Sequence, residues 1–335
     1  MWRVRGIAIS IVATSCGYPE LPGLPGDGPP RTSSCTDPAV TCGVGPSASC
    51  CHAATVPGGT FHRNYDVAND MLHGDMGYPA MVSTFVLDTY EVTVGRFRAF
   101  VNAGMGTQAS PPAAGSGAHP RLPGSGWDSN WNTDLVTTTA ELVAAVKCKS
   151  WTQTWTDAPG PNENKPMNCV SWYEAMAFCI WDGGYLPTET EWNYAASGGD
   201  EQRVYPWSKP ASAMDIDCAH ANYRVDDPPG MYCAGATGST ERVGSESPDG
   251  DGRWGHADLA GNMYEWMLDW YVDTPPATCD DCANLKPPPD PRMRVTRGGH
   301  FYNLALYLRV AARYFDTMRR EYIGLRCARD PVVSP

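Results

Sequence analysis

Residues 258–271 read DLAGNMYEWMLDWY, and residues 294–301 read RVTRGGHF. They belong to a chain of 335 residues, longer than the usual ~100–200 residues of one domain, so one large domain with accessory segments and two domains are both admissible. The 34 Gly and 30 Pro break helices and strands, so we expect much ordered irregular structure. The 12 Trp and 16 Tyr against 7 Phe favour a loop-rich core whose rings also form hydrogen bonds.

The formal charge of the chain is −12, and it contains no basic run. This excludes the electrostatic footprint of a nucleic-acid binder or of a protein that binds anionic membranes, and the acidic excess is interpreted as a solvated surface. Beyond the N-terminal segment, no stretch is long and apolar enough for a transmembrane helix. We therefore expect no nucleic-acid partner, and membrane contact only through a lipid anchor.

The N-terminal residues 1–16 read MWRVRGIAISIVATSC, with two arginines before a short apolar run and small residues before Cys16. This is the layout of a secretory signal, and because it ends on a cysteine it resembles a bacterial lipoprotein signal in which Cys16 is lipidated. An ordinary signal or a misassigned start is the alternative. Of the 13 cysteines, setting Cys16 aside leaves 12, which are enough for six bridges in an oxidising compartment. We expect an extracytoplasmic protein, lipid-anchored to the bacterial cell envelope at the outer membrane.

The segment that follows the signal combines the composition of a linker with a cluster of cysteines. Residues 17–53 are dense in Pro, Gly and Ser, and they carry cysteines at 35, 42, 50 and 51. We predict a tether whose distal part is stapled by disulfides. The folded domain is predicted to span residues 54–330 and to open with a strand over residues 56–61.

Periodicity and capping residues predict the first helices of this domain. Residues 83–104 change from strand-like alternation to helical spacing, with Thr93 at the N-cap position and Gly104 at the C-cap position. Residues 105–165 are too long for a connection without structure of its own, so an ordered surface insertion is predicted, with a helix over residues 138–148.

Two capping boxes predict the next two helices. Ser171 is followed three residues later by Glu174, which is the spacing of a capping box at the start of an amphipathic helix. Thr188 and Glu191 repeat the spacing and open a third helix, whose buried face is expected to carry Trp192 and Ala195.

Five segments taken together, in this order, resemble the formylglycine-generating enzyme (sulfatase-modifying factor) family. They are FVLDTYEVTVGRFRAFV (85–101), NCVSWYEAMAFCIWDGGYLPTETEWNYAASGG (168–199), DLAGNMYEWMLDWY, RVTRGGHF and YIGLRCARD (322–330). The resemblance runs from about residue 56 to residue 330. It implies one asymmetric α+β (mixed α/β) domain that is loop-rich and has the C-type-lectin-like fold.

The resemblance also exposes a departure from the active members of the family. In those members, two cysteines five residues apart follow the RGG segment, bind copper and oxidise a substrate cysteine to formylglycine. Here the first position is Asn303, the second has no counterpart among residues 304–308, and His300 replaces the serine after RGG. Because a thiolate binds Cu(I) and starts this chemistry, the known reaction and a copper cofactor are not expected. His300, Tyr302 and Asn303 are expected to line the equivalent of the catalytic pocket.

The resemblance implies one disulfide, Cys179 with Cys327. A second family pair falls on Ala196 and Val310, so both of its halves are absent together. The CDDC sequence at residues 279–282 admits a redox motif, but without a thioredoxin pattern a structural bridge is favoured. Proximity along the chain suggests two further pairs, Cys218 with Cys233 and Cys148 with Cys169.

A calcium site is the cofactor that the resemblance supports. It places side-chain ligands at Asp258 and Glu265 and backbone carbonyl ligands at Gly261 and Met263, a set of hard oxygen donors that suits Ca²⁺. A metal-free turn capped by Asp258 is the alternative.

A second family calcium site is expected to be weaker. It would use Asn222 and Tyr223, but the carboxylate expected further on falls near Gly235, and Asp226 or Asp227 would have to replace it.

These observations leave two main functional hypotheses. The first is a non-catalytic, lipid-tethered module that uses the surface near His300 and the aromatic-rich insertion to bind a peptide, protein or glycan. The second is an oxidoreductase of the same family with an active site rebuilt around His300. A structural spacer is a third. We favour the binding module. We do not expect enzymatic activity, although the sequence leaves that question open.

Overall fold

The computed structural model describes residues 33–35, 41–43, 49–68, 76–148, 151–226, 228–290 and 292–331. The predicted signal at residues 1–16, with its lipidation site Cys16, and most of the predicted tether lie outside these residues. Within the described part of the chain, no helix has the length and hydropathy needed to cross a membrane.

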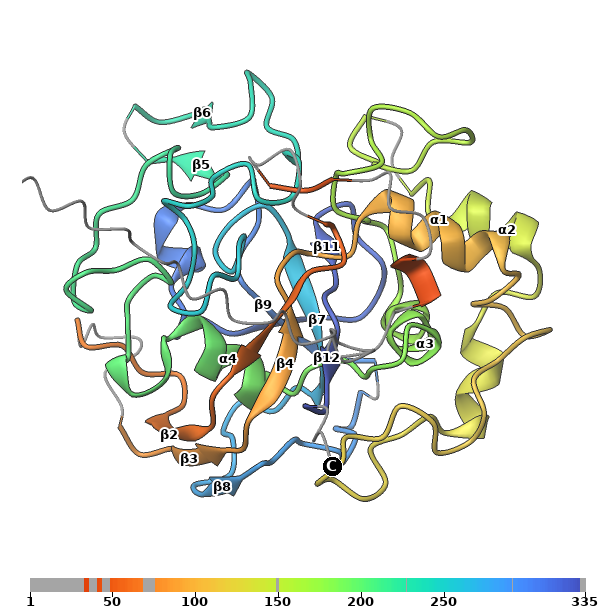
Figure 1. Cartoon of the computed structure of the whole chain (residues 1–335), viewed down its shortest axis with the longest axis horizontal. Coiled ribbons are helices and arrows are strands. Elements are labelled where there is room, and N and C mark those ends of the chain that lie inside the picture. Colours follow the sequence, from red (N-terminus) through yellow and green to blue (C-terminus); the bar gives the residue numbers. More distant parts are fainter. Residues whose placement is uncertain are drawn as a thin grey trace, which may run out of the picture.

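The two stretches that distinguish the sequence form the centre of the molecule. Strand β7 (Tyr264–Trp270) pairs antiparallel with β9 (Arg294–Arg297), and the four-stranded sheet has the order β10-β9-β7-β11. Every residue of β7 and β9 is buried. The edge strands are β10 (Tyr314–Asp316) and β11 (Ile323–Gly324). Figure 1 shows β7 and β9 passing through the middle of the fold.

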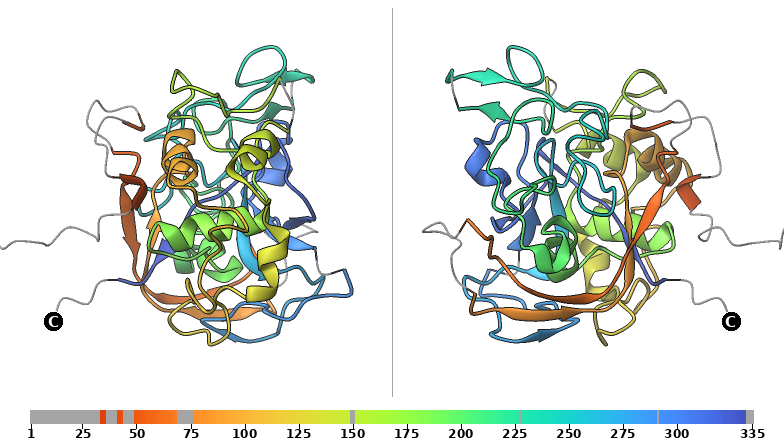
Figure 2. Two further views of the ribbon diagram at one scale, coloured as in Figure 1. Left: turned by 90° about the vertical axis from the view of Figure 1, so that its right-hand side faces the viewer. Right: turned by 60° about the vertical axis from the view of Figure 1, so that its left-hand side comes forward.

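Three smaller sheets surround this centre. One has the order β1-β4-β12, with β1 at Ala53–Val56, β4 at Phe85–Asp88 and β12 at Ala328–Arg329, so it joins the two ends of the domain. Another has the order β2-β3-β8, with β2 at Gly59–His62, β3 at Pro79–Val82 and β8 at Cys279–Asp280. The third pairs β5 (Arg224–Val225) with β6 (Met231–Tyr232). Figures 1 and 2 place β5 and β6 at the opposite end of the molecule from β2, β3 and β8.

The helices begin where their caps predict. Thr93 caps α1 (Val94–Asn102), whose C-cap is Ala103 rather than the predicted Gly104. Gly104 follows the cap with φ +74°, the left-handed conformation that favours glycine just beyond a helix end. Both predicted capping boxes are present, at the starts of α3 (Trp172–Trp181) and α4 (Glu189–Ala196).

The insertion over residues 105–165 is ordered, as predicted. It contains the 3-10 helix η2 (Ser129–Asp134) and α2 (Thr139–Ala145), which is shorter than the predicted 138–148 and begins at a capping box on Thr138. The other 3-10 helices are η1 (Ser33–Cys35), η3 (Gly199–Glu201) and η4 (Ala305–Leu308).

Tryptophan N–H groups attach the helical layer to the central sheet. The indole nitrogen of Trp172 in α3 donates to the carbonyl of Met267 at 2.7 Å, and that of Trp266 in β7 donates to the carbonyl of Val170 at 3.1 Å. Such rings bury a large apolar area and still satisfy their polar atom. This is the use of tryptophan that the composition indicates.

Six disulfides connect the 12 cysteines of the described residues, and they include every pair that the sequence suggests. The predicted bridge between Cys179 and Cys327 is confirmed and links α3 to the C-terminal segment. The distal tether is stapled, as predicted, by Cys35–Cys51 and Cys42–Cys50. The remaining bridges are Cys148–Cys169, Cys218–Cys233 and Cys279–Cys282.

Candidate functional site

The segment after β9 is fixed by a tight double-glycine turn. Gly298 and Gly299 have φ of +98° and +76°, and a Cβ on Gly299 would lie 2.8 Å from the side chain of Leu308. The carbonyl of Gly298 accepts the N–H of Gly261 at 2.9 Å, and the N–H of Phe301 donates to the carbonyl of Asn262 at 3.1 Å. The turn therefore holds the RGG segment against the turn that precedes β7.

His300 does not line an open surface, which corrects the prediction. The side chain is buried, and its ring stacks on Tyr322 with the centroids 4.3 Å apart and meets Tyr264 edge-on at 5.0 Å. Burial lowers the pKa of His300 to about 3, so the ring is neutral at physiological pH. Its Nδ1 accepts the N–H of Tyr302 at 3.2 Å, so the proton of the neutral ring lies on Nε2. His300 is therefore part of the packing under the segment.

Asn303, which the resemblance places at the first family cysteine position, also has a structural role. Its Oδ1 accepts the N–H of His300 at 3.0 Å, and its carbonyl accepts the N–H of Arg224 in β5 at 2.9 Å. Because every cysteine in the described part of the chain is bridged, these residues offer no free thiol to a soft metal.

Tyr302 alone of the three predicted pocket residues contributes its ring to an aromatic surface. The ring is partly exposed and lies 5.8 Å from Tyr232 in β6 and 6.2 Å from Trp151, centroid to centroid. Trp151 is 63% exposed, and the buried Tyr302 hydroxyl has no hydrogen-bond partner among the described residues. Trp151, Tyr232 and Tyr302 are hereafter called the aromatic surface.

Two members of the aromatic surface were not assigned from the sequence. Trp151 belongs to the Trp-rich run WTQTW at residues 151–155, which is the local signal of an aromatic patch. Tyr232 gives no such signal, because only the β5–β6 pairing brings it to Tyr302.

The two carboxylates of the calcium site predicted at residues 258–265 already have hydrogen-bond partners within the protein. Both carboxylate oxygens of Glu265 accept hydrogen bonds from Arg326, each at 2.7 Å, and one of them also accepts from Trp192 at 2.9 Å. The Oδ2 of Asp258 accepts the N–H of Gly244 at 2.6 Å. Because Glu265 is committed to a buried ion pair, the expected ligand set with Asp258, Gly261 and Met263 does not fit this arrangement. Among the residues that the structure describes, no group of three or more His, Cys, Asp or Glu side chains could hold a metal ion.

Of the two predicted calcium sites, the weaker one at Asn222 and Tyr223 has a buried oxygen without a hydrogen-bond partner among the described residues. Asn222 is 1% exposed, and its Oδ1 is buried without a hydrogen-bond partner in the described part of the chain. Its Nδ2 is satisfied by the carbonyl of Ser239 at 2.8 Å and by the Oδ1 of Asn262 at 3.2 Å. The carbonyl of Tyr223 already accepts the N–H of Cys233 at 3.0 Å but keeps a second lone pair. An orphaned buried oxygen of this kind fits a hard cation.

The carboxylate that this second site would need is not supplied by its predicted substitutes. Asp226 is exposed, and Asp227 lies outside the described residues. Glu91 is fully buried, and its Oε1 has no partner among the described residues, while its Oε2 accepts from the Nδ2 of Asn262 at 2.8 Å. Asn262 thus connects two buried side chains, Asn222 and Glu91, that each carry an unsatisfied oxygen.

The structure belongs to a class of loop-rich α+β folds that are built around a buried antiparallel pair of strands, here β7 and β9, with the RGG turn directly after β9. The solved structure of PvdO from Pseudomonas aeruginosa has this fold, with a TM-score of 0.56 at 19% identity over 83% of this chain and 94% of that one.

Sequence comparison narrows the class to one family. The family described as the sulfatase-modifying factor enzyme 1-like domain matches residues 44–331, and the chain belongs to it. The formylglycine-generating enzyme of Thermomonospora curvata is 31% identical over 304 residues, which is 83% of this chain and 93% of that protein. The inactive C-alpha-formylglycine-generating enzyme 2 of Bos taurus is 30% identical over 170 residues, covering 49% of this chain and 50% of that protein.

Proposed function

We propose that this protein is a family member that binds a peptide at the aromatic surface and does not carry out copper-dependent cysteine oxidation. The observation that carries the proposal is that the segment after RGG contains no cysteine and that its polar side chains are used in packing. Asn303 and the buried His300 hold the turn, while Tyr302 presents its ring beside Trp151 and Tyr232. The alternative of an oxidoreductase rebuilt around His300 is disfavoured, because a neutral ring packed against Tyr322 has no free approach to a substrate.

The chemistry of the surface favours a peptide over a glycan. Met231 in β6 is 53% exposed, and Leu306 and Tyr307 after the RGG turn are 41% and 38% exposed. Exposed aromatic anchors, with flexible apolar side chains on the neighbouring segments, suit the varied side chains of a polypeptide.

We also propose an extracytoplasmic location with a lipid anchor at Cys16. Six disulfides in one domain support an oxidising compartment.

The peptide-binding proposal is tested by selecting random 12-residue peptides from a phage library on the full-length protein and measuring the affinity of a selected synthetic peptide. We expect Trp151→Ala and Tyr302→Ala each to raise the Kd by about tenfold or more, because aromatic anchors dominate binding free energy. Phe315→Ala is the matched control, since Phe315 is 44% exposed and packs on Tyr271, away from the aromatic surface.

Three results would contradict this proposal. A selected peptide that binds both aromatic variants as tightly as the unmodified protein would place the site elsewhere. Failure to select any peptide, together with glycan binding that Trp151→Ala abolishes, would make the surface a glycan site. Formation of formylglycine in a cysteine-containing peptide, detected by mass spectrometry, would overturn the loss of the parent reaction.

We further propose that calcium binds at Asn222 through its Oδ1, with the carbonyl of Tyr223 as a second donor. Bound calcium would neutralise local negative charge and hold the loop at Cys233 to the turn before β7. We expect 1 mM Ca²⁺, compared with a chelator, to raise the Tm by about 5 °C, because a ligand present far above its Kd adds about 2–3 kcal/mol to stability. Asn222→Leu should abolish the shift and Asn222→Asp should keep it. An equal Tm in calcium and chelator would exclude the site.

A further inference from the structure

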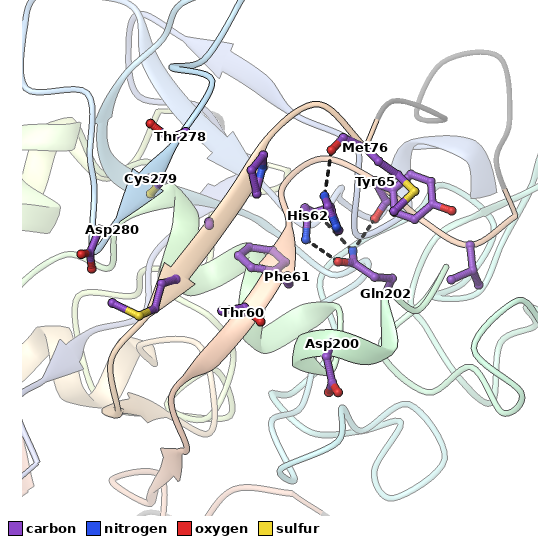
Figure 3. A pocket seen from close by; sticks show the side chains of 14 residues that line it. Thr60, Phe61, His62, Tyr65, Met76, Asp200, Gln202, Thr278, Cys279 and Asp280 are labelled. Atoms are coloured by element: carbon purple, nitrogen blue, oxygen red, sulfur yellow. Dashed lines mark hydrogen bonds between the residues drawn. The ribbon is translucent and has the colours of Figure 1, made fainter.

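A pocket of about 770 Å³ is lined by residues of β2, β3 and β8 (Figure 3), strands that lie at the opposite end of the molecule from β5 and β6 (Figure 1). Strands β2, β3 and β8 and the η3 region contribute its walls. Phe61, Met76 and Met81 make them largely apolar. The side chain of Gln202 is bonded to the backbone N–H and carbonyl of His62, and the Nδ1 of His62 is bonded to the carbonyl of Met76.

The wall of this pocket includes one half of a short-range disulfide. Cys279 in β8 lines the pocket and is bridged to Cys282, three residues later. The loop between them is anchored, because the carboxylate of Asp281 accepts the N–H and the hydroxyl of Ser83 at 2.7 and 2.6 Å. The disulfide therefore sits at a defined place: Cys279 is 8% exposed and lines the pocket, and Cys282 is partly exposed outside the pocket lining.

The sulfur of Cys282 faces a buried cation. Arg63 is only 5% exposed, and its Nη1 lies 3.6 Å from the Sγ of Cys282. Its Nη2 donates to the carbonyl of Pro276, and its Nε has no partner among the described residues. The nearest strong acceptor, Glu189, is already bonded to Arg297 and Arg313, so the guanidinium of Arg63 is not consumed by that ion pair.

A hydroxyl completes the surroundings of the bridge. The Oγ1 of Thr190, which is 3% exposed, lies 3.6 Å from the Sγ of Cys279 and 3.7 Å from that of Cys282. A disulfide sulfur is a poor acceptor and gains little from such donors. A thiolate at Cys282 would gain a charge-assisted bond from Arg63, and cations beside a cysteine lower its pKa and make it a better leaving group.

We propose that Cys279–Cys282 is a thiol–disulfide exchange site for a cysteine-bearing polypeptide that enters the pocket. The substrate thiolate attacks the Sγ of Cys279, the bond between the two protein sulfurs breaks, and its electron pair leaves on Cys282 as a thiolate beside Arg63. A second substrate thiolate then attacks the substrate sulfur of this mixed disulfide and releases Cys279. The substrate dithiol is oxidised to a disulfide, and the protein disulfide is reduced to a dithiol.

The charge around the pocket selects among thiols. Asp280 lines the pocket with an exposed carboxylate, Asp200 lines it while paired with Arg253 at 3.0 Å, and the whole chain carries −12. An anionic thiol is repelled by this field, whereas a neutral or cationic one is accepted. The substrate class is therefore a neutral or basic polypeptide thiol.

The test measures how fast each disulfide of the full-length protein is reduced by cysteamine, which is cationic, and by mercaptoethanesulfonate, which is anionic. Samples are quenched with acid and alkylated, and the modified cysteines are quantified by mass spectrometry. We expect Cys279–Cys282 to react at least tenfold faster than Cys218–Cys233, with the mixed disulfide on Cys279 and with a preference for cysteamine. Cys218 is exposed, so accessibility alone predicts the reverse order.

Variants separate this chemistry from accessibility. Arg63→Gln should slow the reduction of Cys279–Cys282 about tenfold and leave the reduction rate of Cys218–Cys233 unchanged. Arg63→Lys should restore part of the reduction rate of Cys279–Cys282. Asp280→Asn should reduce the preference for cysteamine. If the Arg63→Gln variant does not fold, Thr190→Val is compared with the unmodified protein instead, and it should also slow the reduction of Cys279–Cys282. Equal rates for the two bridges in the unmodified protein, or a rate that neither Arg63→Gln nor Thr190→Val changes, would overturn the proposal.

Discussion

Replacing Arg326 with methionine is expected to lower the free energy of unfolding by about 3–5 kcal/mol, because it leaves a buried charge without its partner. Arg326 and Glu265 are both fully buried, and the guanidinium also donates to the carbonyls of Asp88, Thr89 and Ala257. The Arg326 side chain thus donates hydrogen bonds both to the Glu265 carboxylate on β7 and to backbone carbonyls at the end of β4. Equilibrium unfolding in urea measures the effect.

The same experiment contains its controls. Arg292→Met removes an exposed arginine that pairs with Asp290 two residues away, and its unfolding midpoint should not change measurably. The double variant Arg326→Met with Glu265→Gln should recover part of the loss, because the unpaired carboxylate is gone. An unfolding free energy for Arg326→Met within about 1 kcal/mol of that of the unmodified protein would mean that the pair is not buried as described.

Removing the Cys179–Cys327 bridge by a double substitution to alanine is expected to cost about 2–5 kcal/mol. The bridge closes a loop with a sequence separation of 148 residues, and both cysteines are fully buried. A longer loop restricts the unfolded chain more, so the loss should exceed that from removing Cys218–Cys233, whose separation is 15. Thermal unfolding of both double variants measures the order. A larger loss from the short bridge would show that native-state strain, not chain entropy, dominates.

The position of the two proposed sites has a consequence for how the protein could work. Tyr232 of the aromatic surface lies in β6 and Cys279 lies in β8, and these two strands are at opposite ends of the molecule (Figure 1). The variants at Trp151 and at Arg63 are therefore expected to affect peptide binding and disulfide exchange independently.

Local features were predictable because their cause lies within a few residues. Capping at Ser171 and Thr188 depends on a side chain and a backbone N–H three residues apart, and both boxes are present. The predicted C-cap of α1, Gly104, is one residue beyond the observed C-cap, Ala103. The exact end of a helix is hard to predict because it depends on which carbonyl groups the last backbone N–H groups bond to. The disulfide between Cys179 and Cys327 was predicted from the family resemblance. Spacing along the sequence could not have predicted it, because the two cysteines are 148 residues apart.

The sequence by itself determined the family, the four described α-helices and the absence of cysteines between residues 282 and 327. Only the tertiary structure decided what the remaining residues do, because burial and pairing depend on elements that meet from distant parts of the chain. Tyr264 and Tyr322 enclose His300, and Arg326 takes both oxygens of Glu265. Arg63 reaches the sulfur of Cys282 across 219 residues of sequence, a contact that no local pattern encodes.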